Sequence, residues 1–125
     1  MKITNQTKNT VLADNVVVAD TFFKRGLGLL GRKEFKPGLA LILDPCNSIH
    51  TFFMRFSIDI LFVDKNKRVI KAISNLKPFR ITPVYFSSAI AIELPAGTIQ
   101  LSSTSQNDTL KLGDVSIFLN KGKKK

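Results

Sequence analysis

A strand–turn–strand pattern in residues 58–73, IDILFVDKNKRVIKAI, decides the fold. In its first half, the alternate residues that begin with Ile58 share one face of an extended segment. The polar residues 64–67 have the composition of a hairpin loop, and the apolar pattern resumes after them. We therefore expect strands at 58–63 and 68–73 that pair antiparallel.

Shorter apolar runs on either side of this hairpin predict more strands than helices. Branched and aromatic residues fill most of these runs, and Gly, Pro, Asn and Asp punctuate them. Pro78 and Pro83 interrupt the stretch that carries Arg80 and Tyr85, so we expect an irregular loop there. The other expected elements are an opening hairpin of strands 11–13 and 16–19, a helix near residues 20–31, strands 39–43, 89–94 and 115–119, and a short helix at 98–103.

This pattern places the chain in the α+β class. Many short strands around one helix predict a β-rich single domain, with a curved, mainly antiparallel sheet or small barrel and one short helix near residues 20–31. The 125 residues suit one domain, which we expect to cover residues 1–120. A disordered basic tail is expected at residues 121–125.

The cysteine content and the apolar runs indicate where the protein works. A single cysteine, Cys46, excludes an internal disulfide. Residues 1–8 contain no apolar stretch that resembles a signal peptide, and no apolar run is long enough to span a bilayer. We expect a cytoplasmic protein with no membrane-spanning segment and no membrane as a partner, and the sequence leaves its oligomeric state open.

The chain is strongly basic, with 19 Lys and Arg residues against 9 Asp and Glu residues and a formal net charge of +10. Such a charge permits weak binding to nucleic acid or to an anionic membrane surface. Four of the lysines lie in residues 121–125, however, and the chain has a single Tyr and no Trp for stacking on bases. No nucleic-acid-binding motif is present, so specific nucleic-acid recognition is not expected.

Cys46 and His50 are the only residues of their types, and both lie just before the central hairpin. A Cys–His dyad would need the imidazole to stabilise the thiolate, and direct contact would require a turn near Pro45. A zinc site would need a third ligand, such as Asp44 or Asp59. The remaining interpretation is structural, with a buried thiol and a hydrogen-bonded imidazole near the margin of a sheet.

Charged residues inside apolar runs are the second candidate feature. Asp59 lies within the first strand of the central hairpin and Glu93 within a later strand. A buried charge is costly unless it is paired, so Arg55 or Arg80 is expected to neutralise one of these carboxylates. Turns near Pro45 and Pro95 could bring His50, Asp59 and Glu93 together in one cleft.

Four sequence blocks occur together in a fixed order. They are Arg25–Arg32 (RGLGLLGR), Ile49–Asp59 (IHTFFMRFSID) followed by Phe62 and Asp64, Glu93–Gly97 (ELPAG), and Leu112–Asp114 (LGD). Over residues 11–119 the chain closely resembles the family called domain of unknown function 192 (DUF 192, also UPF 0127). Its H-T-x-x-M-x-x-x-x-D block falls on His50, Thr51, Met54 and Asp59. The resemblance implies a compact β-rich domain with a short helix and no assigned activity.

These residues favour a binding protein, with two alternatives left open. The chain holds no complete catalytic or metal-binding set, so no cofactor is expected. We expect a non-catalytic module that binds a small anionic ligand in a mixed apolar and charged cleft. The alternatives are an enzyme that uses Cys46 and His50, with or without a metal, and a weak binder of nucleic acid or another polyanion. The expected ligand-binding residues are His50, Phe52, Arg55, Asp59, Arg80, Tyr85 and Glu93.

Overall fold

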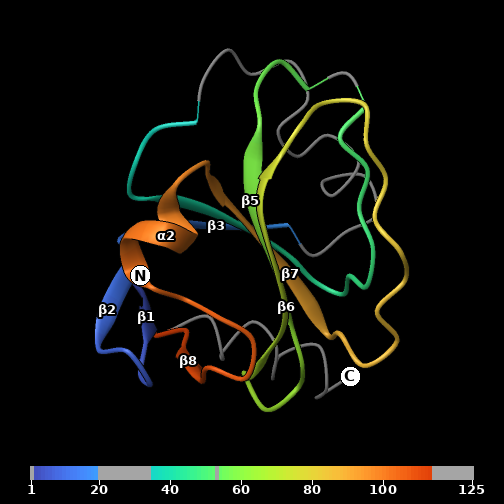
Figure 1. Cartoon of the computed structure of the whole chain (residues 1–125). Helices are drawn as coiled ribbons and strands as arrows, with labels where there is room; N and C mark the ends of the chain where they lie inside the picture. The colour runs from blue at the N-terminus through green and yellow to red at the C-terminus, as the bar shows by residue number, and fades with distance from the viewer. Residues whose placement is uncertain (1, 20–34, 53, 114–125) are drawn as a thin grey trace.

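The computed structural model describes residues 2–19, 35–52 and 54–113, which form two β-sheets and a short helix (Figure 1). One sheet has three strands in the order β2-β1-β8, and the other has five in the order β3-β4-β7-β5-β6. Within these residues the strands form two sheets rather than a closed barrel, which confirms the β-rich α+β class. The elements are β1 (Ile3–Asn5), β2 (Thr10–Ala13), β3 (Asn15–Ala19), β4 (Leu39–Leu43), β5 (Ile58–Val63), β6 (Val69–Leu76), β7 (Ile90–Pro95), α2 (Thr98–Ser102) and β8 (Leu110–Lys111).

The central hairpin is confirmed. Strands β5 and β6 pair antiparallel, with Leu61 opposite Ala72. In the turn, the Asp64 carboxylate accepts hydrogen bonds from the backbone N–H groups of Asn66 (2.9 Å) and Arg68 (3.0 Å). Strand β5 also pairs antiparallel with β7, and every residue of both strands is buried. These two strands therefore form the centre of the larger sheet.

The larger sheet separates two apolar cores. Leu61, Ile92 and Leu94 face the first core, where β1, β2, β8 and α2 contribute further buried residues. Ile60 and Phe62 face the second core, on the other side of the sheet. Residues from the segments that follow β4 and β6 pack over this second core, so those segments cover the side of the sheet opposite α2.

The expected opening hairpin of strands 11–13 and 16–19 is wrong. Strands do form there, but β2 pairs antiparallel with β1 in the smaller sheet, whereas β3 pairs parallel with β4 in the larger one. The chain changes sheets at Asp14, where the backbone N–H groups of Asp14 and Asn15 both donate to the Gly38 carbonyl. The backbone N–H groups between the two strands therefore bond to the segment before β4, and not to each other's strand as in a hairpin.

Three more of the expected elements are present, and the others lie outside the described residues. Strands 39–43 and 89–94 are confirmed as β4 and β7, and the short helix at 98–103 as α2. The expected helix near 20–31, the strand at 115–119 and the basic tail lie outside the described residues. None of the helices in the described part of the chain has the length and hydropathy needed to cross a membrane.

A buried polar cluster joins the smaller sheet to the segment after α2. The Asn5 amide donates to Asp108 Oδ2 (2.8 Å) and Thr104 Oγ1 (3.0 Å), and Lys8 forms a salt bridge with Asp108 (2.9 Å). Desolvation by burial raises the pKa of Asp108, but the hydrogen bonds from Asn5 and Lys8 outweigh this effect and bring the pKa below its usual value. This cluster has a structural role and lies apart from the predicted site residues.

Candidate functional site

Two segments that are distant in sequence run side by side over the second core, and we call residues 44–57 and 77–88 the paired loops (Figure 1). Four backbone hydrogen bonds join them along their length, and one of these runs from the Phe79 N–H to the Thr51 carbonyl. In the other three, the Tyr85 N–H donates to the Asn47 carbonyl (2.8 Å), the Thr82 N–H to that of Ile49 (2.9 Å), and the Thr51 N–H to that of Arg80 (2.8 Å). The paired loops are therefore a hydrogen-bonded unit, although the described residues of neither segment form a regular strand.

Thr51 is the centre of this unit. It is fully buried, and its carbonyl accepts hydrogen bonds from the N–H groups of Phe79 (3.0 Å) and Met54 (3.2 Å). Its hydroxyl donates to the Lys77 carbonyl (2.6 Å) and accepts from the Arg80 N–H (2.9 Å). The threonine of the H-T-x-x-M block thus fixes the backbone of both loops.

We expect Thr51→Val to lower the free energy of unfolding by about 2 kcal/mol, because Val keeps the shape but leaves two backbone groups without their hydroxyl partner. Chemical denaturation measures this loss. Amide hydrogen exchange should become faster at Phe79 and Arg80 while the β5–β6 amides keep their protection. Unchanged exchange at Phe79 and Arg80 would contradict the role given to Thr51.

The paired loops carry most of the large hydrophobic side chains that the described residues expose. Phe79 is 61% exposed, Ile81 71% and Phe86 90%. Single exposed apolar residues are common on protein surfaces, but several on neighbouring segments are unusual. The Phe52 and Phe79 rings touch across the two loops, with centroids 6.4 Å apart. We call this set the apolar rim, and it consists of Phe52, Phe79, Ile81, Val84 and Phe86.

The backbone of Phe79 is held in a conformation that a bulky residue rarely adopts. Its φ is +62°, in the left-handed region, while its N–H donates to Thr51. Such strain persists only where surrounding contacts impose it, and it is frequent at functional positions. The hydrogen bonds of the paired loops therefore hold Phe79 in place with its ring exposed.

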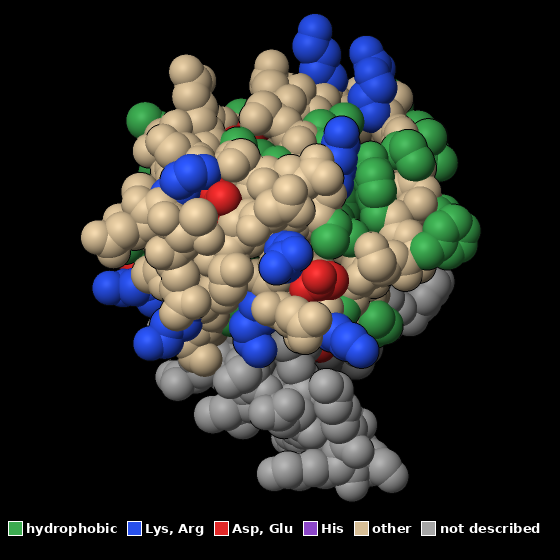
Figure 2. All heavy atoms as spheres, turned by 60° about the horizontal axis from the view of Figure 1, so that its bottom comes forward, with side chains coloured by type: hydrophobic (Ala, Val, Ile, Leu, Met, Phe, Trp, Pro, Cys, Tyr) green, Lys and Arg blue, Asp and Glu red, His purple; other side chains and the backbone are tan. Residues whose placement is uncertain are grey.

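Cationic side chains share these segments with the apolar rim. Arg55, Lys77 and Arg80 are exposed, and none has a carboxylate ion-pair partner among the described residues. Arg80 Nη1 instead donates to the carbonyls of Pro78 and Phe79, each at 3.4 Å. Figure 2 shows hydrophobic side chains gathered on the right, the side on which the paired loops run in Figure 1, with Lys and Arg side chains near them.

The contact that a Cys46–His50 dyad would need does not form. The Cys46 thiol donates to the Ser48 carbonyl (3.1 Å) within its own turn. His50 is exposed, its ring stacks on Phe52 with centroids 5.1 Å apart, and its Nδ1 accepts from the Phe52 N–H (3.3 Å). The two side chains therefore engage different partners, and the turn at Pro45 does not bring them together.

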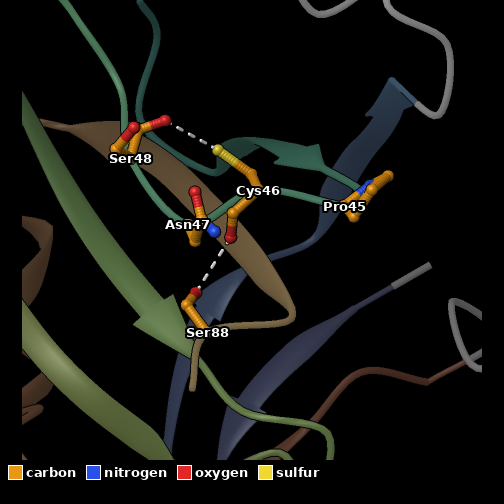
Figure 3. A pocket seen from close by; sticks show the side chains of 5 residues that line it. All are labelled: Pro45, Cys46, Asn47, Ser48 and Ser88. Carbon is orange, nitrogen blue, oxygen red and sulfur yellow. Dashed lines mark hydrogen bonds between the residues drawn. The ribbon is translucent and has the colours of Figure 1, made fainter. Parts of the chain in front are cut away.

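A small hollow opens beside Cys46 (Figure 3). It has a volume of about 260 Å³, and its lining consists of Pro45, Cys46, Asn47, Ser48 and Ser88. The Ser88 hydroxyl donates to the carbonyls of Cys46 and Ile90, both at 2.9 Å, so it is engaged within the protein. Of the predicted site residues, only Cys46 lines this hollow.

Asp59 is fully buried, but its partners differ from those expected. Its carboxylate accepts three backbone hydrogen bonds, from Asn75 (2.8 Å), Gly97 (3.1 Å) and Ile99 (2.8 Å). The expected pairing with Arg55 or Arg80 is therefore wrong, because backbone N–H groups of β6 and of the start of α2 stabilise the carboxylate by hydrogen bonds instead. In the described part of the chain, no group of three or more His, Cys, Asp and Glu residues could hold a metal ion.

Glu93 lies on the other face of the same sheet. It is opposite Ile60 and Leu41 and thus faces the second core, whereas Asp59 is opposite Leu94 and faces the first. Desolvation by burial raises the pKa of Glu93 to about 8, and its Oε2 has no hydrogen-bond partner among the described residues. Asp59 and Glu93 therefore cannot share a cleft, and the expected convergence with His50 is wrong.

The predicted ligand-binding residues thus separate into two that are buried in the larger sheet, Asp59 and Glu93, and five that belong to the paired loops. His50, Phe52, Arg55 and Arg80 are exposed on the paired loops. Tyr85 belongs to the same loops but is half-buried, with its ring 4.7 Å from that of Phe62. The residues predicted for the site did not include Ile81 and Phe86, which the structure exposes on the same loops. The closely spaced prolines of residues 78–83 were the available signal, since a loop cannot bury successive side chains.

The fold and the loop surface define a β-rich α+β domain that carries an irregular surface on one face of a five-stranded sheet. The chain belongs to the DUF192 family, described as Uncharacterized ACR, COG1430, whose model matches residues 2–112. A UPF0127 protein of Pyrococcus horikoshii is 38% identical over 87% of this chain and 96% of its own length. One from Pyrococcus furiosus is 35% identical over 86% of this chain and 94% of its own length.

A solved structure shares this fold. The crystal structure of a protein of unknown function from Novosphingobium aromaticivorans has a TM-score of 0.78 with this chain, at 19% sequence identity. The alignment covers 89% of this chain and 84% of that one. At this identity the similarity describes the architecture, and the function has to be argued from the residues of this chain.

Proposed function

We propose that the protein is a non-catalytic binding module whose ligand carries an anionic group next to an apolar group. The supporting observation is the set of hydrogen bonds at Thr51, which fixes Phe52 and Arg80 beside each other on a prearranged surface. Binding costs less when the contacting groups are already ordered. Arg80 and Arg55 are suited to an anionic group, while His50 and Phe52 offer a stacked pair of rings to an apolar one.

Several contacts favour binding over catalysis. The Cys46 thiol and the His50 imidazole engage separate partners, so the base that a nucleophilic cysteine requires is not beside it. Asp59 is occupied by three backbone N–H groups on the far face of the sheet. The groups that remain on the paired loops are those that recognise a ligand by charge and by apolar contact.

Hexyl phosphate tests this proposal, because it joins an anionic group to a short apolar chain. We expect it to raise the melting temperature and to shift the backbone NMR signals of residues 50–55 and 79–82, since binding to the folded state stabilises it. Inorganic phosphate and hexanol each lack one half of the ligand and should give smaller effects at equal concentration.

Arg80→Gln should weaken the binding of hexyl phosphate about tenfold, because a charge-assisted hydrogen bond is lost. Lys65→Gln removes the same charge from the exposed β5–β6 turn and is the matched control. Equal weakening by the two substitutions would show that only the net charge matters. An absence of binding by hexyl phosphate to the unmodified protein would refute the proposed function.

A further inference from the structure

The apolar rim is larger than a small ligand requires. Its five side chains extend over both paired loops, and Phe86, at 90% exposure, is its most exposed member. The hollow beside Cys46 contains none of the rim residues in its lining. A small ligand buries itself mainly in a concave site, whereas an exposed apolar patch of this extent is typical of a surface that meets another surface.

The composition of the rim indicates which kind of surface. Phe79, Ile81 and Phe86 lie in a single loop, in which Lys77 and Arg80 are also exposed. Amphipathic elements that lie in a membrane interface combine aromatic and aliphatic side chains with Lys and Arg. The apolar side chains reach the acyl boundary, while the cations meet anionic headgroups.

The charge of the molecule agrees with this partner. The formal net charge is +10, and the one ion pair among the described residues, between Lys8 and Asp108, lies outside the paired loops. An anionic bilayer attracts such a protein from solution, and each Lys or Arg near the surface contributes to binding. An acidic protein partner with an apolar surface would meet the same side chains, and an absence of vesicle binding would favour it over the bilayer.

We propose that the apolar rim docks the protein on the surface of an anionic phospholipid bilayer. Phe86 and Ile81 insert at the level of the headgroups, and Lys77 and Arg80 bind the lipid phosphates. This inference rests on the same loops as the proposed function and names a lipid headgroup with its acyl chain as the ligand. The hydrogen bonds at Thr51 and the strained backbone of Phe79 keep the rim exposed before it meets the membrane.

The chain contains no Trp, which allows a site-specific fluorescent reporter. Phe86→Trp places a single indole on the rim, and Leu101→Trp places one on α2, where Leu101 is 88% exposed. With vesicles of phosphatidylcholine and phosphatidylglycerol in equal parts, the emission of the Phe86→Trp variant should shift to shorter wavelength. The emission of the Leu101→Trp variant should not shift, and neither variant should respond to vesicles of phosphatidylcholine alone.

A pair of Ser substitutions measures how much the rim contributes. In sedimentation with the same anionic vesicles, Phe86→Ser should weaken partitioning about tenfold, because a large apolar side chain no longer leaves water. Leu101→Ser has the same charge and an equally exposed starting residue, and should leave partitioning unchanged. The full chain is used throughout, so any contribution of the basic residues 121–125 is common to both variants.

The outcomes separate this inference from the proposed function. If both Trp variants bind anionic vesicles without a spectral shift, adsorption is electrostatic alone and the docking surface is refuted. If hexyl phosphate binds but vesicles do not, the inference fails while the proposed function stands. If Phe86→Ser weakens vesicle binding about tenfold and leaves hexyl phosphate binding intact, both are supported, since Phe86 is not among the residues proposed to bind hexyl phosphate.

Discussion

Glu93→Gln is expected to stabilise the protein above pH 8 by about 5 kcal/mol relative to the unmodified chain, because burial raises the pKa of Glu93 from 4.5 to about 8. Below pH 4.5 the carboxyl is protonated in both the folded and the unfolded chain. As the pH rises toward 8, the unfolded chain loses this proton first, so the stability contribution of Glu93 declines. Above that pH the folded protein must bury an ionised group.

The measurement is the free energy of unfolding of both proteins by chemical denaturation between pH 5 and pH 9. The difference between them should grow from pH 5 to about pH 8 and then level off, because Gln does not ionise and Glu93 is ionised in both states above its folded pKa. Infrared spectroscopy gives a second readout at pH 7, where a protonated carboxyl band should be present in the unmodified protein and absent from Glu93→Gln. Parallel stability curves would show that Glu93 ionises as readily as in the unfolded chain.

Asp59→Asn is expected to lower the free energy of unfolding by about 3 kcal/mol, because a buried carboxylate that accepts three backbone hydrogen bonds is replaced by an amide. The amide NH₂ group would point at one of these N–H donors and leave it buried without an acceptor. Chemical denaturation at neutral pH measures the loss, and amide exchange at Gly97 and Ile99 locates it.

Asp64→Asn is the matched control. Asp64 also accepts backbone N–H groups, those of Asn66 and Arg68, but its hydrogen bonds are exposed to solvent in the β5–β6 turn. Water can replace a lost partner there, so we expect a cost of about 1 kcal/mol or less. Equal costs at the two positions would mean that burial of Asp59 adds nothing to its contribution.

The parts of the fold that depend on neighbouring residues could be predicted from the sequence. The β5–β6 hairpin follows from alternation and from a polar turn within sixteen consecutive residues, 58–73. The opening hairpin failed for the opposite reason, since the partner of β3 is β4, which begins twenty residues after β3 ends. Alternation shows that a strand forms, but it does not identify the strand with which it pairs.

In the candidate site too, local features could be predicted from the sequence, whereas features that depend on residues distant in sequence could not. The sequence identified Asp59 as a buried charge, yet its partners are backbone N–H groups, which have no residue-type signature. Which faces Asp59 and Glu93 occupy depends on the β5–β7 register, where Asp59 is opposite Leu94 and Glu93 is opposite Ile60. That register is set by contacts distant in sequence, so convergence in one cleft could not be tested before the strands were paired.

The hydrogen bonds of the Asp59 carboxylate can form only when β5 is correctly aligned with both of its neighbouring strands. Its two oxygens meet the N–H of Asn75 in β6 and those of Gly97 and Ile99 just after β7, the strands on either side of β5. A slip of β5 by one residue would turn the charge into the second, apolar core, and a slip by two would carry it about 7 Å from these donors. Misaligned sheets therefore contain an unsolvated anion, and only the native alignment of three strands avoids it.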